Sequence, residues 1–139
     1  MKFWDRSAIT PLLVEEVDSG KRESDLRSDT AMLVWYGTLA EIESALCRRL
    51  RENPAWSGEG VIAREKLRYL SDSWMEVEPT RMVRSRALRL LRVHSLRAAD
   101  AFQLAAALVA FGEQTTDRQF LTGDSRLGAA ALAEGFVVG

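Results

Sequence analysis

The chain has 139 residues, of which 47% are hydrophobic and 28% are charged, and its formal net charge is −1. This length and composition are those of one globular domain over residues 1–139, and they exclude collagen, a coiled coil, a disordered chain or a second independent core. The single cysteine, Cys47, excludes an intrachain disulfide, and the absence of a long apolar run argues against a membrane span. With no signal-peptide pattern at the N-terminus, a cytoplasmic location is expected.

The first half of the chain alternates strand-like apolar runs with helical patterns. In chain order we expect a strand over 2–4, a helix over 8–17, a polar loop or short helix over 18–30, a strand over 32–36 and a helix over 38–52. Thr38 and Glu41 have the spacing of a capping box, which predicts that the last of these helices opens there.

The second half continues the same alternation. The expected elements are a helix over 61–72, a weak strand over 75–77, helices over 80–93 and 96–111, a strand over 120–122, a helix over 124–134 and a strand over 136–138. Strands that alternate with helices predict an α/β fold with a mostly parallel sheet. Folds of this class bind ligands at the carboxyl ends of their strands, so that edge is where chemistry is expected.

Two aspartates follow predicted strands. Asp5 comes directly after the first strand, and Asp124 follows the strand in FLTGD. A helix-capping role explains each of them taken alone. Taken together, they place two carboxylates at the sheet edge where a ligand would bind.

Asp100 lies in AADAFQLAAALVAF, a helical segment that is apolar on almost every face. A buried carboxylate is costly unless it is paired or bound to a cation. Arg97 or Arg92 could be a structural partner. We favour a functional role, because the alanine-rich surroundings leave room for a ligand to approach.

Glu41 and Glu43 both lie on the helix after the second strand, and helical phase does not choose between them. The structural interpretation of Glu41 is the reciprocal capping bond to Thr38. The structural interpretation of Glu43 is a solvated surface charge near Arg49 or Cys47.

A cluster of carboxylates repels itself unless a cation is present. Mg²⁺ and Mn²⁺ prefer carboxylate oxygen and water, whereas the soft ligands Cys47 and His94 stand too far apart in the sequence to suggest zinc. Such an ion polarises phosphate and activates water, so the pattern favours phosphodiester hydrolysis.

The charges are unevenly distributed in a way that suits this chemistry. Residues 48–97 carry +6, between an N-terminal segment of −4 and a C-terminal segment of −3. A basic segment of this kind indicates contact with a polyanion or an acidic partner.

Four segments resemble the signatures of PIN-domain proteins, in the right order and over nearly the whole chain. They are FWDRSAITPLL, WYGTLAEIESALCRRL, LRAADAFQLAAAL and FLTGDSRLGAAALAEGF. The third is the most specific, and the group most similar to this chain is the VapC-type toxins of bacterial toxin–antitoxin pairs.

The resemblance implies a three-layer α/β/α fold with a central sheet of four to five strands and a Mg²⁺- or Mn²⁺-dependent ribonuclease that cuts RNA. It implies that Asp5 and Asp100 are the principal metal ligands and that Glu41 and Asp124 complete the cluster. The alignment of EIESAL selects Glu41 over Glu43. An antitoxin partner and a homodimer are implied by the resemblance alone.

The residue after the first aspartate departs from the family pattern. PIN-domain proteins commonly have serine or threonine there, and this chain has Arg6. Arg6 could contact phosphate, or it could pair with a carboxylate and weaken metal binding. Ser7 matches a polar position near the family's metal, and Asp117 is a spare acid that we expect in a loop.

The remaining features favour structural roles. The arginines of the 80–93 helix are expected to form a solvated face, with an RNA-facing or partner-facing strip as the alternative: Arg81, Arg84, Arg89 and Arg92. His94 is expected to cap or pack at a helix end. Trp4 and Trp35 should lie in the core, whereas Trp56 and Trp74 could serve a partner surface.

Two rival functions remain open at the level of sequence. One is a catalytically weak PIN-like module that binds a protein partner, with Arg6 disabling the site. The other is a receiver-like phospho-acceptor domain, which also gathers acids at strand ends. That domain needs a lysine after a late strand, and the only lysines are Lys2, Lys21 and Lys66.

Overall fold

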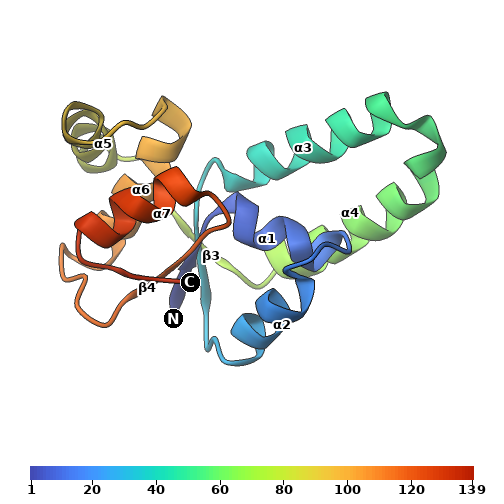
Figure 1. Cartoon of the computed structure of the whole chain (residues 1–139), viewed down its shortest axis with the longest axis horizontal. Helices are drawn as coiled ribbons and strands as arrows, with labels where there is room; N and C mark the ends of the chain where they lie inside the picture. The colour runs from blue at the N-terminus through green and yellow to red at the C-terminus, as the bar shows by residue number, and fades with distance from the viewer.

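The computed structural model describes all residues, 1–139, as five strands and seven α-helices with one short 3-10 turn, η1 (Figure 1). The strands are β1 (Lys2–Trp4), β2 (Met32–Trp35), β3 (Met75–Val77), β4 (Gln119–Leu121) and β5 (Val137–Val138). The helices and the turn are α1 (Arg6–Leu13), α2 (Ser19–Arg27), α3 (Thr38–Glu52), η1 (Pro54–Trp56), α4 (Ser57–Ser71), α5 (Arg81–Val93), α6 (Ala98–Ala110) and α7 (Ser125–Ala133).

The five strands form one sheet in the order β3-β2-β1-β4-β5, and every neighbouring pair is parallel. The chain starts at the central strand β1, adds β2 and β3 on one side, and then crosses to β4 and β5 on the other. The predicted three-layer α/β/α fold is confirmed, with a sheet that is parallel throughout. The order in which strands are added reverses at β1, and this switch creates the crevice where such folds bind ligands.

Two hydrophobic clusters cover the two faces of this sheet, because successive side chains of a strand point to opposite faces. Phe3 belongs to a cluster formed with α5, α6 and α7, and Phe120 stacks on its ring at 5.2 Å between centroids. Trp4 belongs to the opposite cluster, formed with α1, α3 and α4. Beyond that second cluster, α3 and α4 extend together away from the sheet (Figure 1).

Several helix boundaries differ from the prediction. Helix α1 begins at Arg6, because Asp5 caps it, and it ends at Leu13, so that Pro11 lies in its second turn. Helix α4 begins at Ser57, with two glycines inside its first two turns. The polar segment 18–30 contains a complete helix, α2, tied to the body by a buried arginine that the sequence pattern does not reveal.

The tryptophan predictions are partly correct. Trp4 and Trp35 are buried, as expected, but Trp74 is buried as well, with its indole nitrogen donating to Glu76. Trp56 is half-buried beneath the Arg49 guanidinium.

The chain contains no helix that is long and apolar enough to span a membrane.

Candidate active site

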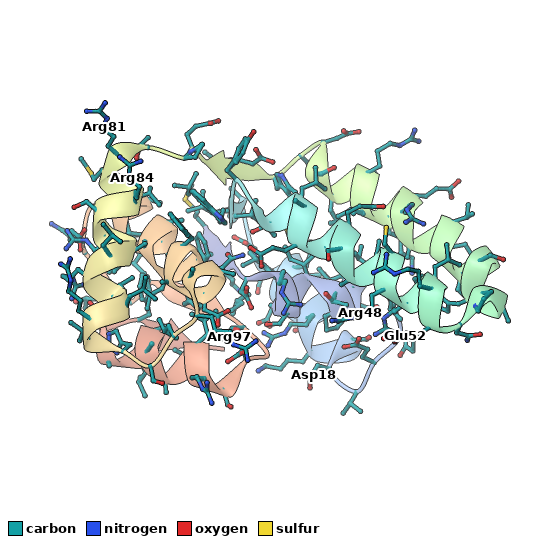
Figure 2. All side chains as sticks on the ribbon, turned by 90° about the horizontal axis from the view of Figure 1, so that it is seen from above. Asp18, Arg48, Glu52, Arg81, Arg84 and Arg97 are labelled. Carbon is teal, nitrogen blue, oxygen red and sulfur yellow. The ribbon has the colours of Figure 1, made fainter.

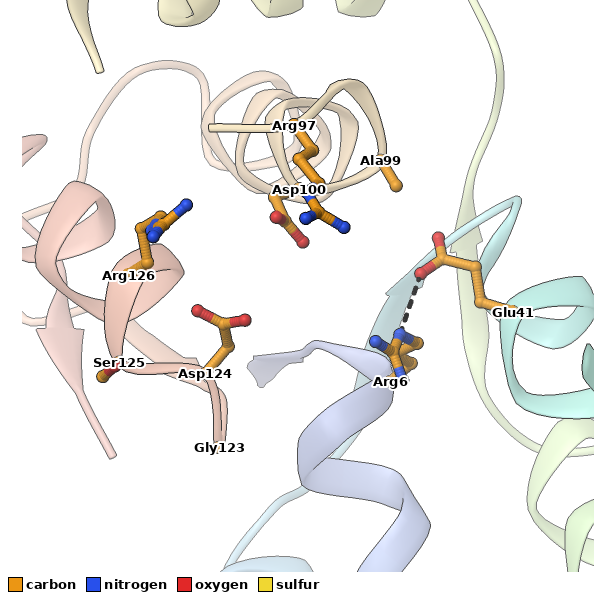
Figure 3. A pocket seen from close by; sticks show the side chains of 9 residues that line it. All are labelled: Arg6, Glu41, Arg97, Ala99, Asp100, Gly123, Asp124, Ser125 and Arg126. Atoms are coloured by element: carbon orange, nitrogen blue, oxygen red, sulfur yellow. Dashed lines mark ion pairs between the residues drawn. The ribbon is translucent and has the colours of Figure 1, made fainter. Parts of the chain in front are cut away.

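Four carboxylates lie around one end of the sheet, each supplied by a different part of the chain. Asp5 follows β1 and Asp124 caps α7, while Glu41 and Asp100 lie in the first turns of α3 and α6. Glu41, Asp100 and Asp124 line a cavity of about 620 Å³ (Figure 3). Asp5 lies just beneath it, close enough for its charge to act on both Glu41 and Asp100.

Asp5 is buried and held by hydrogen bonds to only one of its two oxygens. Its Oδ2 accepts from the Ser7 amide at 3.2 Å, from the Ser7 hydroxyl, and from the Thr122 hydroxyl at 3.0 Å. The side chain therefore caps α1, as its structural interpretation requires. Oδ1 accepts no hydrogen bond from the protein, so Asp5 can cap the helix and still offer an oxygen to a ligand.

A buried arginine supports this arrangement from below. Arg22 of α2 is 2% exposed, and its Nη2 donates to the Thr122 carbonyl at 2.9 Å. Its Nη1 pairs with Asp25 at 3.2 Å. Arg22 thereby fixes the residue whose hydroxyl holds Asp5, over a separation of 100 residues in the chain. No local sequence signal could identify this contact.

Asp124 also has both a structural and a possible chemical role. Its Oδ1 accepts from the Leu127 amide at 2.9 Å, which caps α7. Its own amide donates to the Thr122 hydroxyl at 3.0 Å, so the two aspartates share one threonine as a spacer. Asp124 forms no ion pair, and its side chain lines the cavity (Figure 3).

Asp100 forms no ion pair and no side-chain hydrogen bond in the structure. Neither Arg97 nor Arg92 pairs with it directly, although the nearby charges of Arg6 and Arg97 lower its pKa in part. Burial raises the pKa of Asp100, and the charges of Asp124 and Asp5 raise it further. A carboxylate in this situation is stabilised by a cation that approaches through the cavity.

Glu41 is held by contacts different from the predicted capping box. The hydroxyl of Thr38 interacts with the Gln103 side-chain amide, whose nitrogen lies 3.0 Å from it and also donates to Glu41 at 3.1 Å. The capping-box prediction is wrong because the tertiary contact with Gln103 takes both side chains. Gln103 is fully buried on α6, where a lone amide among alanines and leucines was the available signal.

Arg6 pairs with Glu41, the second of the outcomes that the sequence left open. Its Nε lies 3.4 Å from Glu41 Oε2 (Figure 3). Burial and the charge of Asp5 nevertheless raise the pKa of Glu41 to about 7, although Gln103 and Arg6 act in the opposite direction. The cluster is therefore short of positive charge even with Arg6 in place.

The raised pKa of Glu41 predicts a pH-dependent stability difference in metal-free protein. The unfolded chain loses this proton above about pH 4.5, while the folded chain keeps it up to about pH 7, so the carboxyl group progressively lowers stability across that window. Glu41→Gln removes this titration. We expect the free energy of unfolding of the variant to gain about 1–2 kcal/mol on wild type between about pH 5 and about pH 8, measured by urea denaturation.

Glu43→Gln is the matched control. A hydrogen bond from Arg64 lowers the pKa of Glu43, so its carboxylate contributes stability above its unfolded pKa, and the variant should lose stability as pH rises. If the free energies of unfolding of wild type and Glu41→Gln changed in parallel with pH, the assignment of the titration to Glu41 would be contradicted.

The acids outside the cluster lie where they cannot join it. Glu43 pairs with Arg64 at 2.8 Å and accepts a hydrogen bond from the Cys47 thiol. Of its two expected neighbours, Cys47 is therefore correct and Arg49 is wrong. Asp117 is exposed in the loop before β4, as expected, with a positive φ of 60°.

The carboxylate oxygens around this cavity suit a hard cation, but they stand apart from one another. No three carboxylate, imidazole or thiol groups stand close enough together to hold a metal ion as the side chains are placed. Mg²⁺ often takes one or two protein carboxylates and completes its shell with water. Asp5 and Asp100 each offer a free oxygen, and a cation would offset both the burial and the acidic neighbours that raise the pKa of Asp100.

Arginines surround the acidic centre. Arg6, Arg97 and Arg126 line the same cavity as the carboxylates, and Arg48 lines an adjoining one beside Arg6 and Glu41. Arg97 and Arg126 form no ion pair, and in Figure 3 they lie on either side of Asp100 and Asp124. Sequence reasoning did not identify Arg126, which is exposed in the first turn of α7.

His94 lies away from the centre and has the packing role that was expected. It ends α5, and its ring lies 2.7 Å from Glu134, which also pairs with Arg89. Burial would raise the pKa of Glu134, but the hydrogen bonds from Arg89 and His94 outweigh it and lower that pKa. Glu134 thus ties α5 to the end of α7.

Comparison with known proteins identifies the fold. No protein-family model matches the sequence, and no curated protein matches it. PAE2754 from Pyrobaculum aerophilum is similar in structure, with a TM-score of 0.70 at 18% identity over 99% of this chain and 87% of that chain. FitAcB from Neisseria gonorrhoeae is similar with a TM-score of 0.68 at 16% identity, over 99% and 96%. The expected PIN-like fold is confirmed, and at these identities the likeness is one of fold.

Proposed function

We propose that this chain is a Mg²⁺- or Mn²⁺-dependent endoribonuclease that hydrolyses RNA phosphodiester bonds. The observation that carries the proposal is the convergence of Asp5, Glu41, Asp100 and Asp124 on one arginine-lined cavity. The resemblance of four sequence segments to PIN-domain proteins selects the same four carboxylates. Asp5 and Asp100 would be the principal metal ligands, with Glu41 and Asp124 completing the cluster.

A bound divalent ion polarises a phosphate oxygen and makes water a nucleophile near neutral pH. The protein's own contribution is to hold the acidic side chains before the ion arrives. Asp5 is fixed by Ser7 and Thr122, Asp124 by its cap on α7, and Glu41 by Gln103. Preorganisation of this kind means that little side-chain ordering is needed when the substrate binds.

Arg97 and Arg126 supply the contacts for the RNA backbone. Both line the cavity, both are exposed, and neither forms an ion pair. Guanidinium groups match the geometry of phosphate oxygens, and the starts of α6 and α7 favour negative charge at the same place. The phosphates on either side of the cleaved bond would therefore lie between α6 and α7.

The direct test is cleavage of single-stranded RNA by the purified chain. We expect cleavage with Mg²⁺ or Mn²⁺ and none in EDTA, with the same RNA left intact by a double variant, Asp5→Asn with Asp100→Asn. Absence of cleavage with either metal would reject the proposal. Cleavage that survives in the double variant would reject the residues assigned to it.

The biological role that fits this activity is the toxin of a toxin–antitoxin pair, acting in the cytoplasm with an antitoxin partner. The VapC-type resemblance supports this role, and the fold agrees with it. We expect induced expression to arrest bacterial growth, and we expect an open reading frame immediately upstream to encode a protein that binds the chain and relieves the arrest. Gel filtration of the purified chain tests the proposed homodimer.

Arg6 decides between an active enzyme and a catalytically weak module. Its pairing with Glu41 favours the weak module, since a guanidinium group on this carboxylate competes with a metal ion. We expect Arg6→Ser to tighten Mn²⁺ binding by about 3- to 5-fold, the amount that loss of a partly exposed ion pair allows. Calorimetry above pH 8 measures this, because Glu41 is then ionised in both proteins.

Arg48→Ser is the matched control, since Arg48 lies beside Glu41 without pairing with it. Equal Mn²⁺ affinities for wild type and Arg6→Ser would show that Arg6 does not compete for the metal, leaving phosphate contact as its role.

A further inference from the structure

A second cavity, of about 400 Å³, lies at the same edge of the sheet above β2 and β3. It is lined by Trp35, Pro79, Thr80, Arg81, Arg84 and Phe102. The proposed reaction uses none of these residues. Its lining combines a pair of aromatic rings with a pair of arginines, and the two halves have different chemistry.

The aromatic half is a stack of two nearly parallel rings. Trp35 and Phe102 have centroids 5.5 Å apart and an interplanar angle of 10°. Phe102 is half-buried, and the indole nitrogen of Trp35 donates to no protein acceptor. Gly37 lets this indole pack closely against the backbone, because a Cβ there would lie 2.7 Å from the Trp35 nitrogen. Such a pair gives the cavity a flat, apolar wall.

The cationic half lies at the start of α5. Arg81 and Arg84 are exposed, neither forms an ion pair, and both project from this end of the helix (Figure 2). The amides of Arg81 and Met82 begin the helix and donate to no acceptor, so the helix end adds positive potential. Glu78 is the nearest acid in the sequence and does not line the cavity.

The two cavities both border α6. Ala99 lines the active-site cavity and Phe102 lines the second one, and residues three apart share one helix face. They are separated by about 4.5 Å along the helix axis. A strand of nucleic acid that enters the first cavity can therefore continue over this face into the second.

We propose that the second cavity binds one nucleotide of the single-stranded RNA substrate, next to the site of cleavage. The base stacks against the Trp35–Phe102 pair, and its phosphate contacts Arg81 and Arg84. This assignment rests on the proposed ribonuclease function and adds a base-contacting subsite to it. A base is favoured over an acidic peptide because a flat, nearly parallel ring pair suits a planar π-system, and stacking on aromatic residues is the usual way in which proteins bind single strands.

The test observes Trp35 directly by nuclear magnetic resonance of the four indole N–H groups. Trp35→Phe assigns the signal by its disappearance. We expect adenosine monophosphate, added to the full chain in EDTA, to shift the Trp35 signal, and ribose 5-phosphate to leave it largely unchanged. Arg84→Gln should weaken this binding, whereas Arg92→Gln, an exposed and unpaired position on the same helix, should not.

A second measurement uses a fluorescent single-stranded RNA in EDTA. We expect Phe102→Leu, which keeps an apolar side chain but removes the ring, to weaken binding about 5-fold or more. Arg81→Gln should lower the slope of log affinity against log salt by about 1, as for one lost phosphate contact. Arg92→Gln should leave both quantities unchanged.

Three results would overturn the subsite. They are equal shifts of the Trp35 signal by ribose 5-phosphate and adenosine monophosphate, a shift by an acidic peptide alone, and no shift with any of them. RNA cleavage that is indifferent to Arg84→Gln and Phe102→Leu would leave the proposed function standing and remove this inference. Nucleotide binding at Trp35 without RNA cleavage under any metal would instead reject the proposed function.

Discussion

Replacement of Asp100 by asparagine is expected to lower the rate of metal-dependent RNA cleavage by about 100-fold or more, because a divalent ion contributes several kcal/mol of transition-state stabilisation. Asp100 has no ion pair in the protein, and burial and the charges of Asp124 and Asp5 raise its pKa. Asparagine keeps the size of the side chain and removes the charge. The folded structure should therefore persist, with equal or higher stability, while metal binding fails.

Asp117→Asn is the control for this prediction. Asp117 is exposed in a loop with a positive φ, a conformation that asparagine also adopts. We expect its cleavage rate to match wild type, measured in single-turnover reactions with a labelled RNA. Equal rates for Asp100→Asn and Asp117→Asn would remove Asp100 from the proposed active site.

The largest effect on stability is expected at Arg22. Arg22→Met leaves the Thr122 carbonyl without its donor and deprives Asp25 of one partner, with Lys2 still 3.7 Å from Asp25. We expect a loss of about 1–3 kcal/mol in the free energy of unfolding, as for a buried acceptor that is left without its charged donor. Urea denaturation measures this loss.

Arg27→Met on the same helix is the matched control. Arg27 is exposed and forms no ion pair or side-chain hydrogen bond, so its replacement should cost less than about 0.5 kcal/mol. If Arg22→Met proved as mild as Arg27→Met, Arg22 would not support Thr122, whose hydroxyl holds Asp5. A drop in RNA cleavage for Arg22→Met at a temperature where it remains folded would further connect α2 to the site.

The positions of the acids relative to strands and helices could be predicted from sequence. Asp5 and Asp124 follow short apolar runs, and strand ends in a parallel sheet lie at one edge. Asp100 stands out because its helix is apolar on most faces. These signals are local, and the structure brings the three residues to one place because the sheet order puts β1 beside β4.

The contacts that hold the acids could not be predicted, because they join distant segments. Thr38 and Glu41 match a local capping rule, yet both contact Gln103, more than 60 residues away. The capping-box pattern describes only bonds within one helix end, and the buried amide of Gln103 provides a stronger competitor for both side chains. The supporting roles of Thr122 and Arg22 could not be predicted for the same reason, because their contacts also join distant segments.

The solvated-face interpretation of α5 holds for only part of that helix. Arg86 and Arg89 are tied to Glu113 and Glu134, while Arg81 and Arg84 are free at a cavity with aromatic walls. Charge counts along the sequence cannot separate paired from unpaired arginines. The net charge of −1 therefore combines an acidic centre with arginines that remain available for phosphate.

Binding of Mn²⁺, followed by the paramagnetic resonance signal of the free ion, tests the central claim that the converging carboxylates hold a divalent cation. Wild type should show saturable binding that Mg²⁺ displaces, and the double variant with Asp5→Asn and Asp100→Asn should lose it. Equal binding of Mn²⁺ by wild type and the double variant, or none by either, would contradict the claim.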